Sequence, residues 1–157
     1  MKTFSMSPIG QVQVKEGEAS IHVFEEFRSG LEKMDRFSHF IALWWASEQD
    51  SPDRRAVLQT PLPYADNLSA GVFACRSEFR PNPIGVTVCQ CLDLDIEKGI
   101  IRVPYIDAFD GTPLLDLKPY FPVCERVKET RVPEWVEGWP EWYEDAYKLA
   151  EMFSDSE

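Results

Sequence analysis

The sequence contains few of the residues from which metal sites and disulfide frameworks are built. It has two isolated histidines, His22 and His39, and its four cysteines show no zinc-ligand spacing. We therefore predict no metal site and reduced, partly buried thiols. No apolar run approaches the roughly 20 residues of a membrane span, and the first residues lack the apolar core of a signal peptide. We expect a cytoplasmic protein with no membrane partner.

Positive charge is also scarce. The chain has 27 acidic and 16 basic residues and a net charge of −11. Because affinity for nucleic acids rests largely on neutralising phosphates, this charge disfavours a nucleic acid as a partner. Ten acidic and four basic residues fall within residues 124–157, which indicates a solvated acidic segment. A local cluster of arginines could still outweigh the total charge.

The chain lacks the G-x-G-x-x-G motif and the strand-helix alternation that mark a parallel nucleotide-binding sheet. Apolar residues instead alternate with others over residues 11–14, 19–23 and 86–96, and residues 40–46 form a continuous apolar run of strand length. Residues 86–96 are expected to form one long, half-buried strand. Many short strands joined by turns indicate an all-β fold, an antiparallel barrel or sandwich.

Two helices are expected beside the strands. Apolar residues at helical spacing predict a short amphipathic helix over residues 25–35, after the first strands. A proline at a first helical position, followed by acid, predicts a second helix that begins near residue 139. We therefore expect a β domain over residues 1–123. An acidic, tryptophan-rich extension with a helix, residues 124–157, is expected to pack on the same domain.

The densest motif covers residues 76–85, where two arginines flank a short turn and two prolines follow. Each proline fixes its own φ near −65° and pushes the residue before it out of the helical region. The motif therefore predicts a stiff loop. The polar residues that this loop holds in fixed directions are Arg76, Ser77, Arg80 and Asn82. Such a loop suits a pre-organised anion or ligand site, because pre-organisation lowers the entropic cost of binding. A plain surface connection is the alternative.

A second dense motif covers residues 107–120. Three aspartates and a lysine fall between Asp107 and Lys118, and Asp110-Gly111 is a strong turn signal. Aspartates in such segments often close turns through their own backbone. They could also bind the hydroxyl groups or the cation of a ligand. Their spacing does not make a convincing metal site.

The two motifs, in this order, resemble the TsaA/TrmO family, and the resemblance covers roughly residues 7–123. The segments that carry it are residues 8–10, 37–39, 71–77, 80–85 and 107–120. The resemblance implies an antiparallel β-barrel, a homodimer and S-adenosylmethionine as the cofactor. It also implies methylation of N6 in a threonylcarbamoyl-modified adenosine at position 37 of certain tRNAs.

The resemblance assigns roles to individual residues. Arg76 and Val86 match cofactor-contacting positions, and residues 104–107 match a cofactor-binding strand end. With the stiff loop and the pair after the central strand, the expected cofactor-binding residues are Ser47, Glu48, Arg76, Ser77, Arg80, Asn82, Val86, Tyr105, Ile106 and Asp107. An arginine can pair with the cofactor's carboxylate through two hydrogen bonds. An aspartate can accept from its ribose hydroxyls, and an aromatic face can lie near its sulfonium.

Methyl transfer to nitrogen depends mainly on aligning the acceptor's lone pair with the methyl group. Asp107 and Asp110 are the candidate catalytic residues, because either carboxylate could orient or deprotonate an acceptor amine. Turn closure is the alternative role for both.

The chain departs from the family at three places. tRNA-acting members often carry an insertion after the first strand, whereas this chain passes directly from Val14 to Gly17. They place a histidine-glutamine pair where this chain has Ser47 and Glu48. Long members have a further C-terminal domain in place of the acidic segment. These departures leave the acceptor open between tRNA and a small molecule. A non-catalytic module that binds S-adenosylmethionine or another nucleotide is the alternative function.

Overall fold

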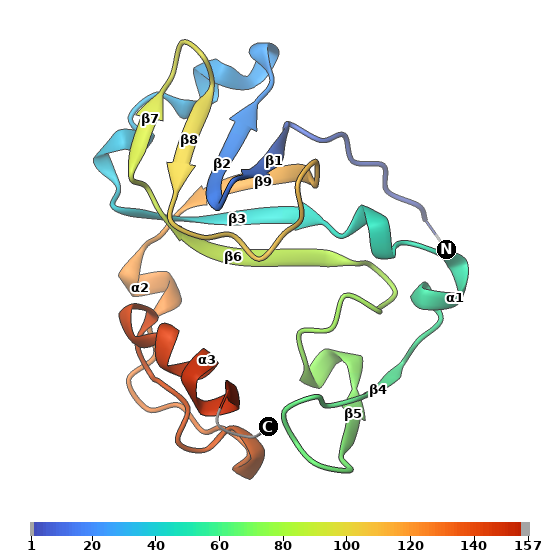
Figure 1. Ribbon diagram of the computed structural model, residues 1–157. Helices are drawn as coiled ribbons and strands as arrows, with labels where there is room; N and C mark the ends of the chain where they lie inside the picture. Colours follow the sequence, from blue (N-terminus) through green and yellow to red (C-terminus); the bar gives the residue numbers. More distant parts are fainter. Residues whose placement is uncertain (1, 155–157) are drawn as a thin grey trace.

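The computed structural model describes residues 2–154, and seven strands form one antiparallel sheet (Figure 1). The strands lie in the order β6-β3-β9-β1-β2-β8-β7. Their bounds are β1 (Gly10–Lys15), β2 (Glu18–Val23), β3 (His39–Trp45), β6 (Ile84–Gln90), β7 (Asp93–Asp95), β8 (Ile100–Val103) and β9 (Pro113–Pro119). Every neighbouring pair is antiparallel, which confirms the predicted antiparallel β class.

The remaining elements are short and lie in the connections. A separate antiparallel pair consists of β4 (Gln59–Pro61) and β5 (Ser69–Gly71). The α-helices are α1 (Pro52–Arg55), α2 (Pro122–Glu125) and α3 (Tyr147–Ser154). The 3-10 helices are η1 (Glu25–Leu31), η2 (Met34–Arg36), η3 (Ser47–Gln49), η4 (Val72–Ala74), η5 (Glu134–Val136) and η6 (Tyr143–Asp145).

The two ends of the sheet, β6 and β7, follow one another along the chain. Between them, the Cys91 N–H donates to the Ser38 carbonyl at 2.8 Å and the Leu92 N–H donates to the Arg102 carbonyl at 2.9 Å. The long strand expected over residues 86–96 is therefore broken at this corner. The hydrogen-bonded order does not return on itself, so closure of the sheet into a barrel stays a prediction.

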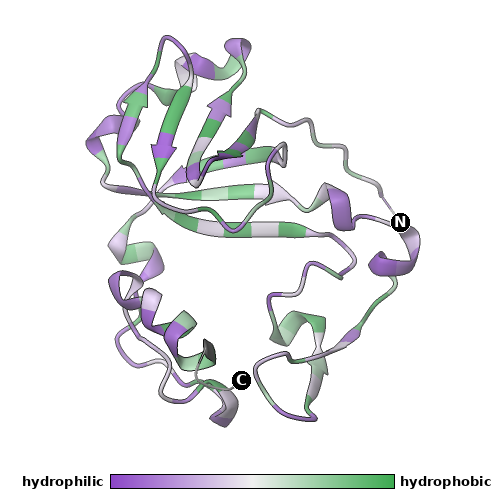
Figure 2. Ribbon diagram, in the orientation of Figure 1, coloured by the Kyte–Doolittle hydropathy of each residue, from purple (hydrophilic) through white to green (hydrophobic). Residues whose placement is uncertain are grey.

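The core lies on the inner face of the sheet, where most strands contribute at least one side chain. The fully buried residues of these strands include Val12, Ile21, Phe40, Cys89, Ile101 and Leu114. In β6, strongly hydrophobic residues alternate with near-neutral ones, whereas β3 is apolar or aromatic from Phe40 to Trp45 (Figure 2). In β6, however, Thr87 and Cys89 point inward while Val86 is 45% exposed, so the inward face is opposite to the one that the valine pattern favours. Burial raises the pKa of the Cys89 thiol to about 12, which makes it unreactive.

Both expected helices differ from their predictions. The segment after β2 forms η1 and η2 in place of one amphipathic helix, because Lys33 between them has a left-handed φ of 68°. The apolar residues of this segment are only partly buried: Leu31 is buried, whereas Phe24 and Phe27 are each 38% exposed. The C-terminal helix α3 begins at Tyr147 instead of near residue 139, because Trp142 is extended before η6.

Aromatic contacts attach the C-terminal segment to two parts of the molecule. The ring of Tyr143 lies 5.2 Å from that of His39 at the start of β3. The ring of Trp139 lies 5.1 Å from that of Tyr64, in the β4–β5 connection, and 5.9 Å from that of Phe153. Figure 1 shows the segment opposite β4 and β5, below the sheet. The division at residue 123 stays a prediction.

Candidate functional site

Three connections meet at one end of the sheet. Trp45, the last residue of β3, pairs with Ile84, the first residue of β6. Trp44 pairs with Leu114 near the start of β9, and Leu114 also pairs with Gly10 at the start of β1. The turn after β3 and the loops that precede β6 and β9 therefore converge. This convergence brings the Ser47-Glu48 pair beside the loop of residues 76–85, hereafter the arginine loop.

Arg80 braces the arginine loop from inside. Its Nε donates to the Ser77 carbonyl at 2.7 Å, and one terminal nitrogen donates to the carbonyls of Val72 and Cys75 at 2.5 and 2.6 Å. The Phe79 N–H adds a bond to the Ser77 hydroxyl at 3.2 Å. These contacts assign Arg80 a bracing role, because most of its donors already serve the loop's own carbonyls.

Arg76, in contrast, faces solvent. It is exposed, and it makes no hydrogen bond, ion pair or ring contact with the rest of residues 2–154. The brace formed by Arg80 holds the backbone on both sides of it. The Arg76 guanidinium can therefore bind an anionic group without first breaking a contact within the protein. Asn82 is also exposed, while Pro83 is buried and fixes the end of the loop.

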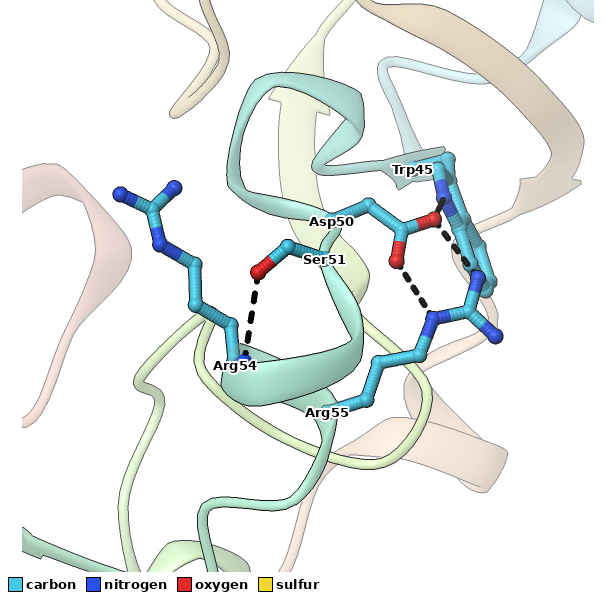
Figure 3. Close-up of polar contacts among 5 residues, drawn as sticks. All are labelled: Trp45, Asp50, Ser51, Arg54 and Arg55. Carbon is cyan, nitrogen blue, oxygen red and sulfur yellow. Dashed lines mark hydrogen bonds and ion pairs between the residues drawn. The ribbon is translucent and has the colours of Figure 1, made fainter.

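A cluster that the sequence did not reveal fastens the turn after β3 (Figure 3). The Asp50 carboxylate accepts from the indole Nε1 of Trp45 at 2.9 Å and from a terminal nitrogen of Arg55 at 2.6 Å, and it also accepts from the Arg55 Nε. The Arg55 guanidinium lies over the Trp45 ring, 5.4 Å from its centre. Hydrogen bonds from Arg55 and then from Trp45 lower the pKa of Asp50 to about 2.

The lowered pKa of Asp50 gives an expected pH dependence. Its usual value is near 3.8, so the ionised carboxylate stabilises the fold above that pH, and this contribution is lost as the pH falls from about 4 towards about 2. In the native chain the melting temperature should therefore fall as the pH is lowered from 5 to 2. In Asp50→Asn this fall should be smaller, because the variant lacks the carboxylate. The control is the exposed Asp53 in α1, the helix that carries Arg55. Asp53→Asn should show the full decline of melting temperature, and equal profiles for both variants would contradict the assignment.

The expected pair after β3 lies at the surface. Ser47 and Glu48 are both exposed in η3. The Glu48 carbonyl accepts a hydrogen bond from the Arg54 side chain at 3.2 Å. The pair is therefore held in place through its backbone, while the two side chains face solvent.

The second motif divides into a turn and an exposed carboxylate. Asp110 accepts from the backbone N–H of Val14 at 2.9 Å, so its carboxylate fastens this turn to β1. Ile106 is buried, and the Tyr105 hydroxyl donates to the exposed Asp107 at 3.2 Å. Partial burial and then the charge of Asp107 raise the pKa of Tyr105 to about 12. No contact among residues 2–154 joins this motif to Arg76.

Two surface hollows lie elsewhere. One, of about 420 Å³, lies in the C-terminal segment between Gly138 and Met152, and one of about 460 Å³ lies between residues 35–38 and 91–94. Neither hollow is lined by a predicted cofactor-binding residue. Among the described residues, no cluster of three metal-ligating side chains occurs, and no helix has the length and apolarity needed to cross a membrane.

A known protein family has a sequence model that matches the region containing both motifs. The model for the tRNA-methyltransferase O N-terminal domain matches residues 2–126. The chain belongs to the tRNA-methyltransferase O (TrmO) family. The match includes the arginine loop and the second motif, the two segments on which the resemblance rested.

Named relatives of this TrmO-family chain come from archaea and bacteria. A probable S-adenosyl-L-methionine-binding protein of Pyrococcus abyssi is 36% identical over 151 residues, 94% of this chain and 73% of the relative. A protein of the same description from Archaeoglobus fulgidus is 36% identical over 92% of this chain, but this chain spans only 35% of its length. The tRNA (adenine(37)-N6)-methyltransferase of Escherichia coli is 30% identical over 74% of this chain and 51% of the relative. These names confirm S-adenosylmethionine as the ligand of the family.

Solved TrmO structures share the fold. A crystal structure of TrmO from Pseudomonas aeruginosa covers 99% of this chain and 74% of that chain, with a TM-score of 0.67 and 26% identity. This match spans almost the whole chain, whereas a second TrmO structure from the same organism covers 83% of it.

One signal in the sequence marks the helix that carries Arg55 of the Asp50 cluster. Ser51-Pro52-Asp53 is a helix start, with a capping serine, proline at the first position and acid in the first turn. The Ser51 hydroxyl accepts from the Arg54 N–H at 3.3 Å. The helix places Arg54 and Arg55 on different sides, so the adjacent pair does not act as one basic patch (Figure 3).

Proposed function

We propose that the chain binds S-adenosylmethionine and transfers its methyl group to a nitrogen acceptor. The observation that carries this proposal is Arg76, an exposed arginine without a partner in the described chain, on the braced loop of a TrmO-family motif. The exposed side chains suit the groups of the cofactor. Arg76 can pair with its carboxylate, Asp107 can accept from its ribose hydroxyls, and the exposed ring of Tyr105 offers a face to its cation.

The chemistry that the bound cofactor supplies is an activated methyl group on a sulfonium. The protein's part is to hold the acceptor nitrogen in line with that group, which is a matter of positioning. Asp107 is exposed and is the better placed of the two candidate carboxylates to orient an acceptor amine, because Asp110 is engaged with β1.

Two acceptors are proposed. The Escherichia coli relative's name supports an adenine of tRNA. The arginines support a small molecule instead, because Arg54, Arg55 and Arg80 are all engaged with groups of the chain itself. Only Arg76 of this cluster remains for a phosphate, and a polyanion needs several such contacts.

An alternative is a module that binds the cofactor without transferring its methyl group. The archaeal relatives are named as binding proteins, and Ser47 and Glu48 stand where tRNA-acting members carry a histidine-glutamine pair. Binding without turnover on any acceptor would favour this alternative.

We also propose a homodimer. Leu58 and Phe73 are 61% and 82% exposed next to the arginine loop, and the carbonyl of Leu58 accepts from Val72, the neighbour of Phe73. Val86 is 45% exposed on β6. A second copy of the chain would remove this apolar surface from water. The molar mass from light scattering tests the proposal, and a monomer at all concentrations would contradict it.

The deciding experiment is a calorimetric titration of the purified chain with S-adenosylmethionine and S-adenosylhomocysteine. We expect both to bind with micromolar affinity. Transfer of a labelled methyl group to bulk tRNA and to small amines then separates the two acceptors, and transfer to neither favours the binding module. A folded chain that binds neither ligand would contradict the proposed function.

A further inference from the structure

Arg54 lies where the turn after β3 meets the arginine loop. One of its terminal nitrogens donates to the Glu48 carbonyl at 3.2 Å and to the side-chain oxygen of Gln49. Its guanidinium carbon lies over the Phe79 ring, 5.0 Å from the centre. The hydrogen bond from the Arg54 N–H to the Ser51 hydroxyl caps α1 and fixes the backbone from which this side chain extends. Figure 3 shows the Arg54 side chain pointing away from the Asp50 cluster.

The arginine loop has few other attachments to this side of the sheet. Arg80 ties residues 72–80 into one unit, so the position of Phe79 also determines that of Arg76. This unit joins β6 through Pro83, whose carbonyl accepts from the Ala46 N–H at 2.9 Å. At its other end, the Val72 N–H donates to the Leu58 carbonyl at 3.1 Å. The contact between Arg54 and Phe79 lies between these two points.

We propose that Arg54 is a positioning residue for the cofactor site. By holding Phe79 on one side and the carbonyl of Glu48 on the other, it fixes the distance between the arginine loop and the turn of residues 47–49. Both segments belong to the predicted cofactor site, so this inference rests on the proposed function. Arg54 acts through Phe79 and the turn, without contact to the ligand.

The test combines a readout without ligand and a readout with it. In Arg54→Leu, we expect faster amide hydrogen exchange at Val72 and Phe79, whose N–H groups donate to the Leu58 carbonyl and the Ser77 hydroxyl, because the unit loses the attachment between its two ends. We also expect affinity for S-adenosylhomocysteine about tenfold weaker, from lost hydrogen bonds and the ring contact. Thermal melting verifies that the variant is folded. The control is Arg131→Leu, an exposed arginine in the C-terminal segment, which should change neither readout.

A double-mutant cycle with Phe79→Ala tests whether Arg54 acts through the loop. If it does, the loss of affinity in the double variant should be no greater than that of the more damaging single variant. Arg54→Lys should keep part of the affinity that Arg54→Leu loses, since lysine retains the charge and one donor nitrogen but not the planar guanidinium.

The outcomes separate this inference from the proposed function. Unchanged exchange at Val72 and Phe79 in Arg54→Leu would overturn the positioning role, whatever the ligand result. Unchanged affinity in a variant whose loop exchanges faster would also overturn it, as would losses that simply multiply in the double variant. If the native chain binds neither S-adenosylmethionine nor S-adenosylhomocysteine, this result would instead contradict the proposed function.

Discussion

Replacement of Gly85 by alanine is expected to lower the free energy of unfolding by about 3 kcal/mol, the upper end of the usual cost of overpacking. A Cβ atom at this position would overlap with three atoms of the Trp44 indole ring. The ring cannot turn aside freely, because its Nε1 donates to the hydroxyl of Thr87 at 3.0 Å. Thr87 is buried, so breaking this bond would leave a polar group without a partner. Denaturant unfolding measures the effect.

Two further variants isolate the cause. In Gly71→Ala, the nearest atom to the new Cβ is the Leu58 carbonyl oxygen at 3.8 Å, which is an ordinary contact, so this strand glycine should tolerate the change. In a Trp44→Leu background the clash is removed, and Gly85→Ala should then cost much less than in the native chain. A Gly85→Ala protein within about 0.5 kcal/mol of the native stability would contradict the expected clash.

The same region of the chain shows what the sequence could predict. The strand β3 was predictable because seven apolar or aromatic residues run without a break between turns. The first hairpin was predictable because strict alternation flanks Glu16-Gly17, where both φ values are positive, at 52° and 84°, as a two-residue turn requires. These signals are local, so no tertiary contact had to be known.

The inward face of β6 was not predictable from alternation alone. Val86 and Val88 suggested one face, but Thr87 and Cys89 are the buried residues. The burial of Thr87 is tolerated because the Trp44 indole supplies a hydrogen bond from the neighbouring strand. A sequence pattern cannot show that partner, and a one-residue shift of register exchanges the faces of a strand.

The candidate site also has one feature that the sequence predicted and one that it could not predict. Stiffness of the arginine loop followed from its two prolines. The separate roles of its arginines did not follow, because they depend on which carbonyls lie within reach. In the structure Arg80 meets three carbonyls and Arg76 meets none. Two arginines four residues apart, chemically identical, thus differ in what they are free to bind.

Replacement of Arg76 by alanine is therefore expected to weaken the affinity for S-adenosylmethionine about 30-fold, or about 2 kcal/mol, the scale of a charge-assisted hydrogen bond. The side chain has no partner among residues 2–154 to lose, so the stability of the fold should stay within about 0.5 kcal/mol of the native value. Arg76→Lys should bind with intermediate affinity, because lysine keeps the charge but cannot form the two parallel hydrogen bonds. Calorimetric titration measures all three proteins.

A ligand without the carboxylate separates this role of Arg76 from a general effect on the loop. 5′-Methylthioadenosine keeps the adenosine and the sulfur but lacks the amino-acid portion, so its affinity should be nearly the same for the native chain and Arg76→Ala. Arg131→Ala removes an equal charge from the C-terminal segment and should leave both affinities unchanged. Equal losses for the two ligands in Arg76→Ala would show that the variant disturbs the loop as a whole. An unchanged affinity for S-adenosylmethionine in the folded variant would remove Arg76 from the site, and the charge that pairs with the cofactor's carboxylate would then have to come from elsewhere.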